Sequence, residues 1–361
     1  MKVLKYITLT LILLNVPTFG LLFFGPSVGS ISNALLFGFI ILYFFLNNKN
    51  KPPLPFFILG LVYFAISGIN YTGIINDYLK DIIRYFIYIV GIVELTKKST
   101  DKELCIFLLI GALSVLINAT VFPSNYGRYS GFYINPNRAG LICLLGFALS
   151  YKLTNKKFKL LAQFLFTIGG IMTLSRYFIL LFVIINILSV VSNRKNLIGL
   201  IAGIIALLIV LTTASLQLNN DRFSALQSIF SNEEVDTKTI TKESRDETWA
   251  KYVDVILDNL VIGNGYKALQ GQDDDTVGIK TGVHNTYLMT IGESGIIPFL
   301  ILLVTYIALF IRSVRHFSEH PEYVYLSSIL LTFLLVSHNY FDNYIILFFS
   351  IWLYKRVATN T

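Results

Sequence analysis

Arginines that flank apolar runs are the side chains of this sequence best suited to bind phosphate. Arg128 and Arg138 lie in the segment 127–140 (GRYSGFYINPNRAG), on either side of an Asn-Pro-Asn turn, and Arg176 follows a serine between two apolar runs. The planar guanidinium group donates two parallel hydrogen bonds to a phosphate. A helix that begins at the turn would add free N–H groups and a favourable dipole. The alternative is an interfacial turn whose arginines reach lipid phosphates.

Two later segments add further groups that could take part in a reaction. Arg245 lies in 244–249 (SRDETW), and His284 begins the run 284–297 (HNTYLMTIGESGII). An imidazole titrates near neutrality and can accept the proton of a sugar hydroxyl. The alternatives are a surface ion pair for the arginine and a structural role for the histidine. His338 begins a third polar cluster (HNYFD), whose alternative is a helix cap with interfacial aromatic residues.

The consecutive acids Asp273, Asp274 and Asp275 suggest a metal site, since hard cations prefer clustered carboxylates. Consecutive side chains splay apart, however, and Gly, Gln and Thr surround these acids, so a solvated loop is favoured. Cys105 and Cys143 lie in apolar runs and are expected to be packing residues. We therefore expect no metal ion and no cofactor.

Composition and hydropathy predict a membrane protein. Of 361 residues, 55% are hydrophobic and 14% are charged, with a mean hydropathy of +0.66, whereas a soluble domain carries about 25% charged residues. Apolar runs of roughly 15–20 residues predict an all-α polytopic membrane protein with about 12 transmembrane helices. The net charge of +8 gives no reason to expect a nucleic acid partner. The predicted spans are 6–24, 31–46, 55–69, 79–95, 104–122, 137–154, 159–174, 177–192, 197–215, 294–312, 323–338 and 342–356.

The distribution of basic residues predicts the orientation. With the N-terminus in the cytoplasm, most of the 29 lysines and arginines fall in short cytoplasmic loops, as the positive-inside rule requires. Both termini are then cytoplasmic. The predicted organisation is transmembrane helices in 1–215 and 286–361, separated by a long outer loop, 216–285, with an amphipathic helix at Glu243–Leu260. Some cations near the outer ends of spans depart from the rule, which suggests that they have a function. They are Lys80, Arg84, Arg128, Arg138 and Arg176.

Together these segments resemble the O-antigen polymerase/ligase superfamily, which comprises Wzy-type polymerases and WaaL-type ligases. The resemblance rests on the arginine-bearing loop with Asn-Pro-Asn, the Ser-Arg hairpin, the late outer loop with Arg…Trp, and the His-Asn-x-Tyr-Leu…Glu-x-Gly run. It covers about residues 120–312 in motifs and the whole chain in topology. Ligases often have His-Ser where this chain has His284-Asn285, which favours a polymerase.

The resemblance implies a GT-C-like, metal-independent glycosyltransferase. In such enzymes two arginines hold the donor pyrophosphate and a histidine serves the acceptor hydroxyl. Matched by motif, these residues are Arg176, Arg245 and His284. Further candidate phosphate or glycan contacts are Arg84, Arg128, Asn135, Asn137, Arg138, Asn285, Tyr287, Glu293 and His338.

The function predicted from these arguments is polymerisation of undecaprenyl-pyrophosphate-linked repeat units, of O-antigen or capsule, on the outer face of the cytoplasmic (inner) membrane. Backside displacement predicts inversion at the anomeric carbon. The expected partners are lipid-linked glycans as donor and acceptor, the bilayer, a chain-length regulator and a flippase. One alternative is an O-antigen ligase that transfers glycan to lipid A-core. Another is a lipid-linked oligosaccharide flippase or transporter, which should place charges in the middle of its spans.

Overall fold

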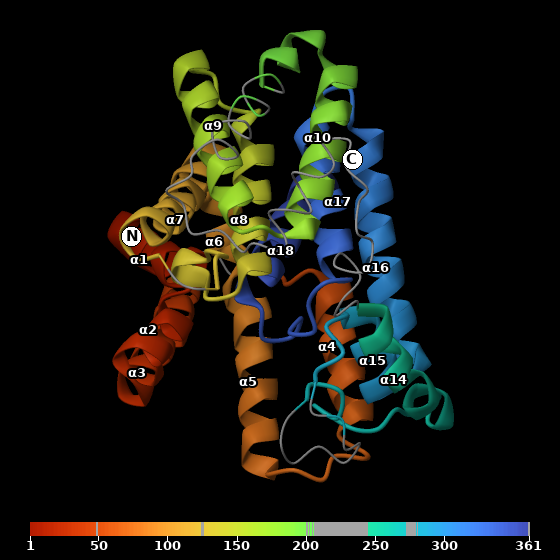
Figure 1. Cartoon of the computed structure of the whole chain (residues 1–361). Helices are drawn as coiled ribbons and strands as arrows, with labels where there is room; N and C mark the ends of the chain where they lie inside the picture. Colours follow the sequence, from red (N-terminus) through yellow and green to blue (C-terminus); the bar gives the residue numbers. More distant parts are fainter. Residues whose placement is uncertain are drawn as a thin grey trace. The chain divides into compact units, whose positions relative to one another are not determined.

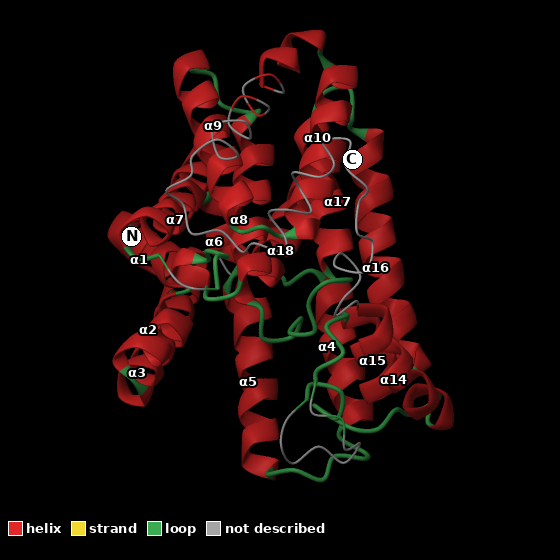
Figure 2. Cartoon of the chain, viewed as in Figure 1, coloured by secondary structure: helices red, strands yellow, loops and turns green. Residues whose placement is uncertain are grey.

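The computed structural model describes residues 1–47, 50–123, 126–199, 201, 203, 205, 245–271, 279 and 281–359, and within these ranges it contains helices and no strand (Figures 1 and 2). The chain divides into two compact units, each described by itself. The first unit comprises Met1–Leu36, Ser99–Lys242 and His316–Ile329. The second comprises Phe37–Lys98, Glu243–Arg315 and Leu330–Thr361.

The core of the first unit is α8 (Pro136–Ser150), which is buried from Ala139 to Ser150. It packs against α7 (Asp101–Val121), α9 (Lys156–Met172) and α10 (Arg176–Ser192). Glycine permits the closest of these approaches, because a Cβ at Gly146 would collide with the ring of Phe166. The unit also contains α1 (Lys2–Leu13), α2 (Val16–Phe24), the short helices η1 (Gly131–Tyr133) and η2 (Arg194–Asn196), and the first parts of α3 (Pro26–Phe45) and α17 (Pro321–Phe333).

Aromatic residues fill much of the core of the second unit. The rings of Tyr63 and Phe341 stack at 3.6 Å, and Phe64 packs edge-on against Tyr85 at 5.5 Å. The buried Tyr85 hydroxyl donates to the Phe56 carbonyl (2.8 Å), as a buried polar group must. Besides the later parts of α3 and α17, the helices of this unit are α4 (Leu54–Ser67), α5 (Ile75–Gly91), α6 (Val93–Lys98), α14 (Arg245–Asp258), α15 (Thr286–Ser294), α16 (Ile296–Arg315) and α18 (Tyr344–Thr359).

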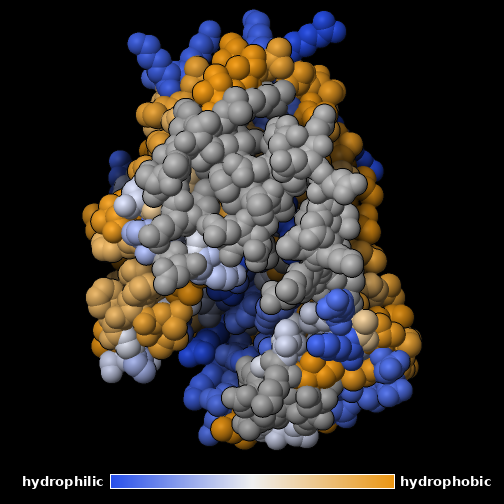
Figure 3. Space-filling view, viewed as in Figure 1, coloured by the Kyte–Doolittle hydropathy of each residue, from blue (hydrophilic) through white to orange (hydrophobic). Residues whose placement is uncertain are grey.

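The helices support the prediction of a helical membrane protein. Among the described residues, α3, α7 and α16 are long and apolar enough to cross a membrane, and α1 with α2 would add a bent span. Among the coloured atoms of Figure 3, hydrophobic residues predominate along both sides of the view, as expected for helices that face lipid. The total of about 12 spans stays a prediction. Most of the predicted span 197–215 and the acids Asp273–Asp275 lie outside the described residues.

The stretch predicted as one span at 6–24 is not a continuous helix but the two helices α1 and α2. α1 and α2 are bent by 61° at Leu14 and Asn15, where Asn15 has a φ of 53°. Pro17 has no N–H to donate to the carbonyl four residues earlier, that of Leu13. The Tyr133 hydroxyl donates to that carbonyl instead, at 2.8 Å.

Boundaries near the candidate site also differ from the prediction. The helix predicted at 294–312 is preceded by a separate helix, α15, and the break falls at Gly295, whose φ is 76°. A Cβ at Gly295 would collide with the carbonyl of Val261, so the chain needs glycine there. α14 covers most of the stretch predicted as an amphipathic helix at 243–260, with Ile256 buried and Val253 about half exposed.

Candidate functional site

The N-terminus of α15 positions His284. Asn285 is the N-cap, and its side-chain oxygen accepts from the backbone N–H groups of Tyr287 (2.9 Å) and Leu288 (3.2 Å). His284 therefore lies just outside the helix, with an exposed side chain and a φ of 48°. Its ring meets that of His338 at 4.5 Å between centroids and 62° between planes. The structure thus brings together two histidines that the sequence separates.

Contacts of the first turn of α15 hold this pair in place. The Thr286 N–H donates to the Leu334 carbonyl (2.7 Å), and the Thr286 hydroxyl donates to the Ser337 carbonyl (2.6 Å). The Tyr287 hydroxyl donates to the Leu331 carbonyl at 2.9 Å. Asn285 and Tyr287, both predicted as glycan contacts, therefore also position the two histidines through the backbone.

Glu293, near the other end of α15, is fully buried. Its carboxylate accepts from the Tyr63 hydroxyl, from the Leu269 N–H (3.3 Å) and from the Gln270 side-chain amide (3.4 Å). Burial raises the pKa of Glu293 to about 7, against the opposing effect of these donors. Glu293 therefore connects α4, α15 and the loop that carries Leu269. The predicted contact of Glu293 with phosphate or glycan stays a prediction.

The loop held by Glu293 carries Lys267, a residue that the sequence did not single out. Its ammonium group forms an ion pair with Asp81 at 2.8 Å, and the Tyr266 hydroxyl donates to the same carboxylate oxygen at 3.0 Å. Burial alone would lower the pKa of Lys267, but the hydrogen bond and the charge of Asp81 raise it. Arg84, predicted as a phosphate or glycan contact, pairs with the other oxygen at 3.2 Å. The closely spaced acids and bases at the start of α5 are the sequence signal for this cluster.

Arg245 is the first residue of α14. Its side chain lies outside the part of the chain that the structure describes. The helix that carries it is tied to the segment before His284, because the Trp249 indole donates to the Val283 carbonyl (3.1 Å) and the Tyr252 hydroxyl to the Thr281 carbonyl (2.6 Å). Arg245 and His284 therefore belong to directly connected elements of one unit.

In the first unit, the loop that precedes α8 is docked on the turn between α9 and α10. Arg128 is only 9% exposed, and its Nε donates to the Thr173 carbonyl at 3.2 Å while Nη1 donates to the Tyr126 hydroxyl at 3.1 Å. The Tyr129 N–H donates to the Met172 carbonyl at 3.2 Å. The buried guanidinium group thus holds two loops together.

A second set of contacts connects the N-termini of α8 and α10. Asn135 caps α8 by accepting from the N–H groups of Asn137 (2.8 Å) and Arg138 (3.4 Å). The Asn137 side-chain oxygen accepts from the hydroxyl of Ser175 (2.9 Å), and Ser175 is itself the N-cap of α10. Arg138 and Arg176 therefore each lie in the first turn of one of two neighbouring helices.

Two groups of predicted residues result. The first unit collects Arg128, Arg138 and Arg176 on adjoining loops and helix N-termini, an arrangement that favours an anion. The second unit contains the adjacent imidazole rings of His284 and His338, and an imidazole can accept a proton.

The comparison with protein families covers part of both groups. Residues 161–303 match a family model described as O-antigen ligase. The matched stretch includes Arg176, Arg245 and His284, and the loop 127–140 lies before it. No curated protein and no solved structure matches the chain. The family match supports the O-antigen polymerase/ligase superfamily for this chain, without separating polymerases from ligases.

Proposed function

We propose that this protein is a membrane glycosyltransferase that polymerises undecaprenyl-pyrophosphate-linked oligosaccharide repeat units on the outer face of the cytoplasmic membrane. The observation that carries the proposal is the O-antigen ligase family match over 161–303, because this stretch contains both the Ser-Arg hairpin and the His-Asn run. The proposal places both termini in the cytoplasm and the loop 216–285 outside. It makes a flippase and a chain-length regulator the expected partners.

In the proposed reaction, a hydroxyl oxygen of the acceptor glycan attacks the anomeric carbon of the donor. The bond between that carbon and the phosphate oxygen breaks, and the lipid pyrophosphate leaves with the electron pair. Arg176 and Arg245 stabilise the developing negative charge, with no metal required. His284 accepts the hydroxyl proton, and its exposed side chain leaves room for an acceptor. Attack from the face opposite the leaving group inverts the configuration.

The remaining candidates have supporting tasks in this proposal. Arg128 and Arg138 add positive charge near Arg176, and the caps made by Asn135 and the contacts of Asn137 hold the two helix N-termini in register. The neighbouring ring of His338 limits the orientations open to the His284 imidazole. A GT-C-like arrangement of helices is part of the same proposal.

A second function is favoured by the description of the matching family as O-antigen ligase. A ligase would use the same donor chemistry but transfer finished glycan to lipid A-core. The choice of asparagine after His284, where ligases often have serine, supports the polymerase.

The surface glycans and lipid-linked intermediates of a deletion strain test these functions. Loss of a polymerase leaves single repeat units that are exported and attached, with no long chains. Loss of a ligase leaves long polymer on the undecaprenyl carrier and bare lipid A-core. Single units retained on the cytoplasmic face would contradict both functions and indicate a flippase. Restoration of the wild-type pattern by a plasmid copy is the control.

A further inference from the structure

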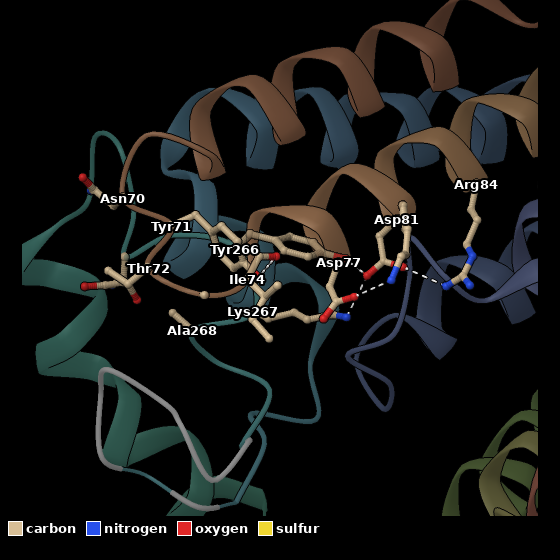
Figure 4. A pocket seen from close by; sticks show the side chains of 13 residues that line it. Asn70, Tyr71, Thr72, Ile74, Asp77, Asp81, Arg84, Tyr266, Lys267 and Ala268 are labelled. Carbon is tan, nitrogen blue, oxygen red and sulfur yellow. Dashed lines mark hydrogen bonds and ion pairs between the residues drawn. The ribbon is translucent and has the colours of Figure 1, made fainter. Parts of the chain in front are cut away.

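Two loops and the start of α5 enclose a pocket in the second unit (Figure 4). Its volume is about 410 Å³, within the range of small-molecule sites. The walls come from 70–74, from the charged face of α5 between Asp77 and Arg84, and from 264–268.

Backbone contacts preform this pocket. The Asn70 side-chain amide donates to the Gly263 carbonyl (2.8 Å), and the Tyr266 N–H donates to the Ser67 carbonyl (2.9 Å). Gly265 has a φ of 100°, and a Cβ there would collide with the Asn70 carbonyl, so the two loops touch backbone to backbone. A ligand would therefore not have to order these loops, which lowers the entropic cost of binding.

One side of the pocket is aromatic. Tyr71 stacks on Tyr78 with ring centroids 5.0 Å apart and planes at 29°. Tyr266 contacts both rings, at 5.8 Å from Tyr71 and 5.1 Å from Tyr78. Tyr71 and Tyr266 line the pocket (Figure 4). A cluster of rings offers a rigid apolar surface on which the C–H face of a sugar ring can pack.

Next to these rings the pocket carries charges that are already paired, and the Tyr266 hydroxyl itself donates to Asp81. Asp81 accepts from Lys267 and Arg84, and Asp77 pairs with Lys80 at 2.9 Å. A free anion would have to compete with these carboxylates for the cations. A hydroxyl group both donates and accepts, so it can bind to paired carboxylates and cations without separating them.

We propose that this pocket binds a neutral sugar residue of a glycan, packed on the tyrosine rings and hydrogen-bonded to the paired charges beside them. The inference rests on the proposed function for the source of the sugar. Its chemistry is independent of transfer, because binding to the pocket requires neither the pyrophosphate nor the reaction at His284.

Binding of a free oligosaccharide tests the proposal. The probe is a neutral oligosaccharide released by mild acid from the surface glycan of the host strain. Its saturation-transfer NMR signals are measured with the full chain in lipid nanodiscs, because maltoside and glucoside detergents would compete for a sugar site. Tyr71→Ala and Asp81→Asn should each weaken binding about tenfold or more, since each removes one wall or a charge-assisted hydrogen bond.

Matched variants distinguish loss of the Tyr71 ring from loss of the folded structure. Tyr71→Phe keeps the ring and loses only the hydroxyl contact with the Ile74 carbonyl (3.2 Å), so it should bind as the wild type does. Lys251→Gln, on the exposed surface of α14, should also leave binding unchanged. Equal thermal unfolding midpoints of wild type and Tyr71→Ala show that the ring itself accounts for the difference.

Several results would overturn the proposal. One such result is that the wild type does not bind the oligosaccharide at millimolar concentration. Another is that Tyr71→Ala binds it as tightly as the wild type does. Inorganic phosphate that displaces the oligosaccharide, and binds less well to Lys80→Gln, would assign the pocket to an anion instead. The control variant His284→Ala should keep full oligosaccharide binding while chain growth stops, so the sugar site and the proposed transferase can fail separately.

Discussion

Replacement of Glu293 by glutamine should change how the stability of the second unit depends on pH. Glu293 lies in α15, before the apolar helix α16, and its carboxyl group is fully buried. The Tyr63 hydroxyl and the Leu269 N–H donate to different oxygens of Glu293, so the single oxygen of glutamine can accept from only one of them. Glutamine cannot ionise. The substitution also removes a hydrogen-bond acceptor, so the effect of the charge is read from the pH dependence of stability and not from stability at one pH.

The pKa shift gives the sign and the size of the effect. Burial raises the pKa of Glu293 from its ordinary value of 4.5 to about 7. The folded state then holds the proton more tightly than the unfolded state, so the stabilising contribution is complete below pH 4.5 and is lost as the pH rises through 7. A shift of this size corresponds to about 3 kcal/mol in the free energy of unfolding.

Intrinsic fluorescence provides the assay, because both tryptophans, Trp249 and Trp352, belong to the second unit. Thermal unfolding of the purified protein is followed from pH 5 to pH 8. The midpoint of the wild type should fall by several degrees more than that of Glu293→Gln over this range. Asp254→Asn, on the exposed face of α14, is the matched control and should follow the wild type. The reasoning fails if the wild type and Glu293→Gln show the same pH dependence.

Three further predictions concern transfer and topology. Arg176→Ala and Arg245→Ala should each abolish glycan transfer with the protein still in the membrane, because a lost bidentate, charge-assisted contact costs about 1.5–3 kcal/mol or more, and lysine should rescue poorly. Normal chain length in these strains would make both residues ordinary interfacial arginines. His284→Ala should lower turnover roughly 10²–10⁴-fold while the donor lipid still binds, as measured with purified protein; unchanged turnover would remove the histidine from the reaction. Reporter fusions after Asn220 should be active outside and those after Lys195 inside, and a cytoplasmic signal after Asn220 would refute the orientation.

Local sequence patterns determined those features of the protein that depend on near neighbours. Runs of apolar residues predicted a helical membrane protein, and α3, α7 and α16 have the length and hydropathy of spans. The Asn-Pro-Asn turn predicted a helix start, and Asn135 is indeed the N-cap of α8. The helix that begins after Asn285 was not predicted. These features follow from hydropathy and capping, which act over a few residues.

Tertiary structure alone decided which distant residues meet. Lys267 pairs with Asp81 across 186 positions of sequence, and Glu293 meets Tyr63 across 230. The bend at the first apolar run also needed a distant residue, since Tyr133 supplies the donor that Pro17 lacks. No local pattern specifies such partners, because each contact forms only when helix packing brings together elements that are distant in the sequence. The buried carboxylate and the sugar-sized pocket of the second unit are consequences of that packing.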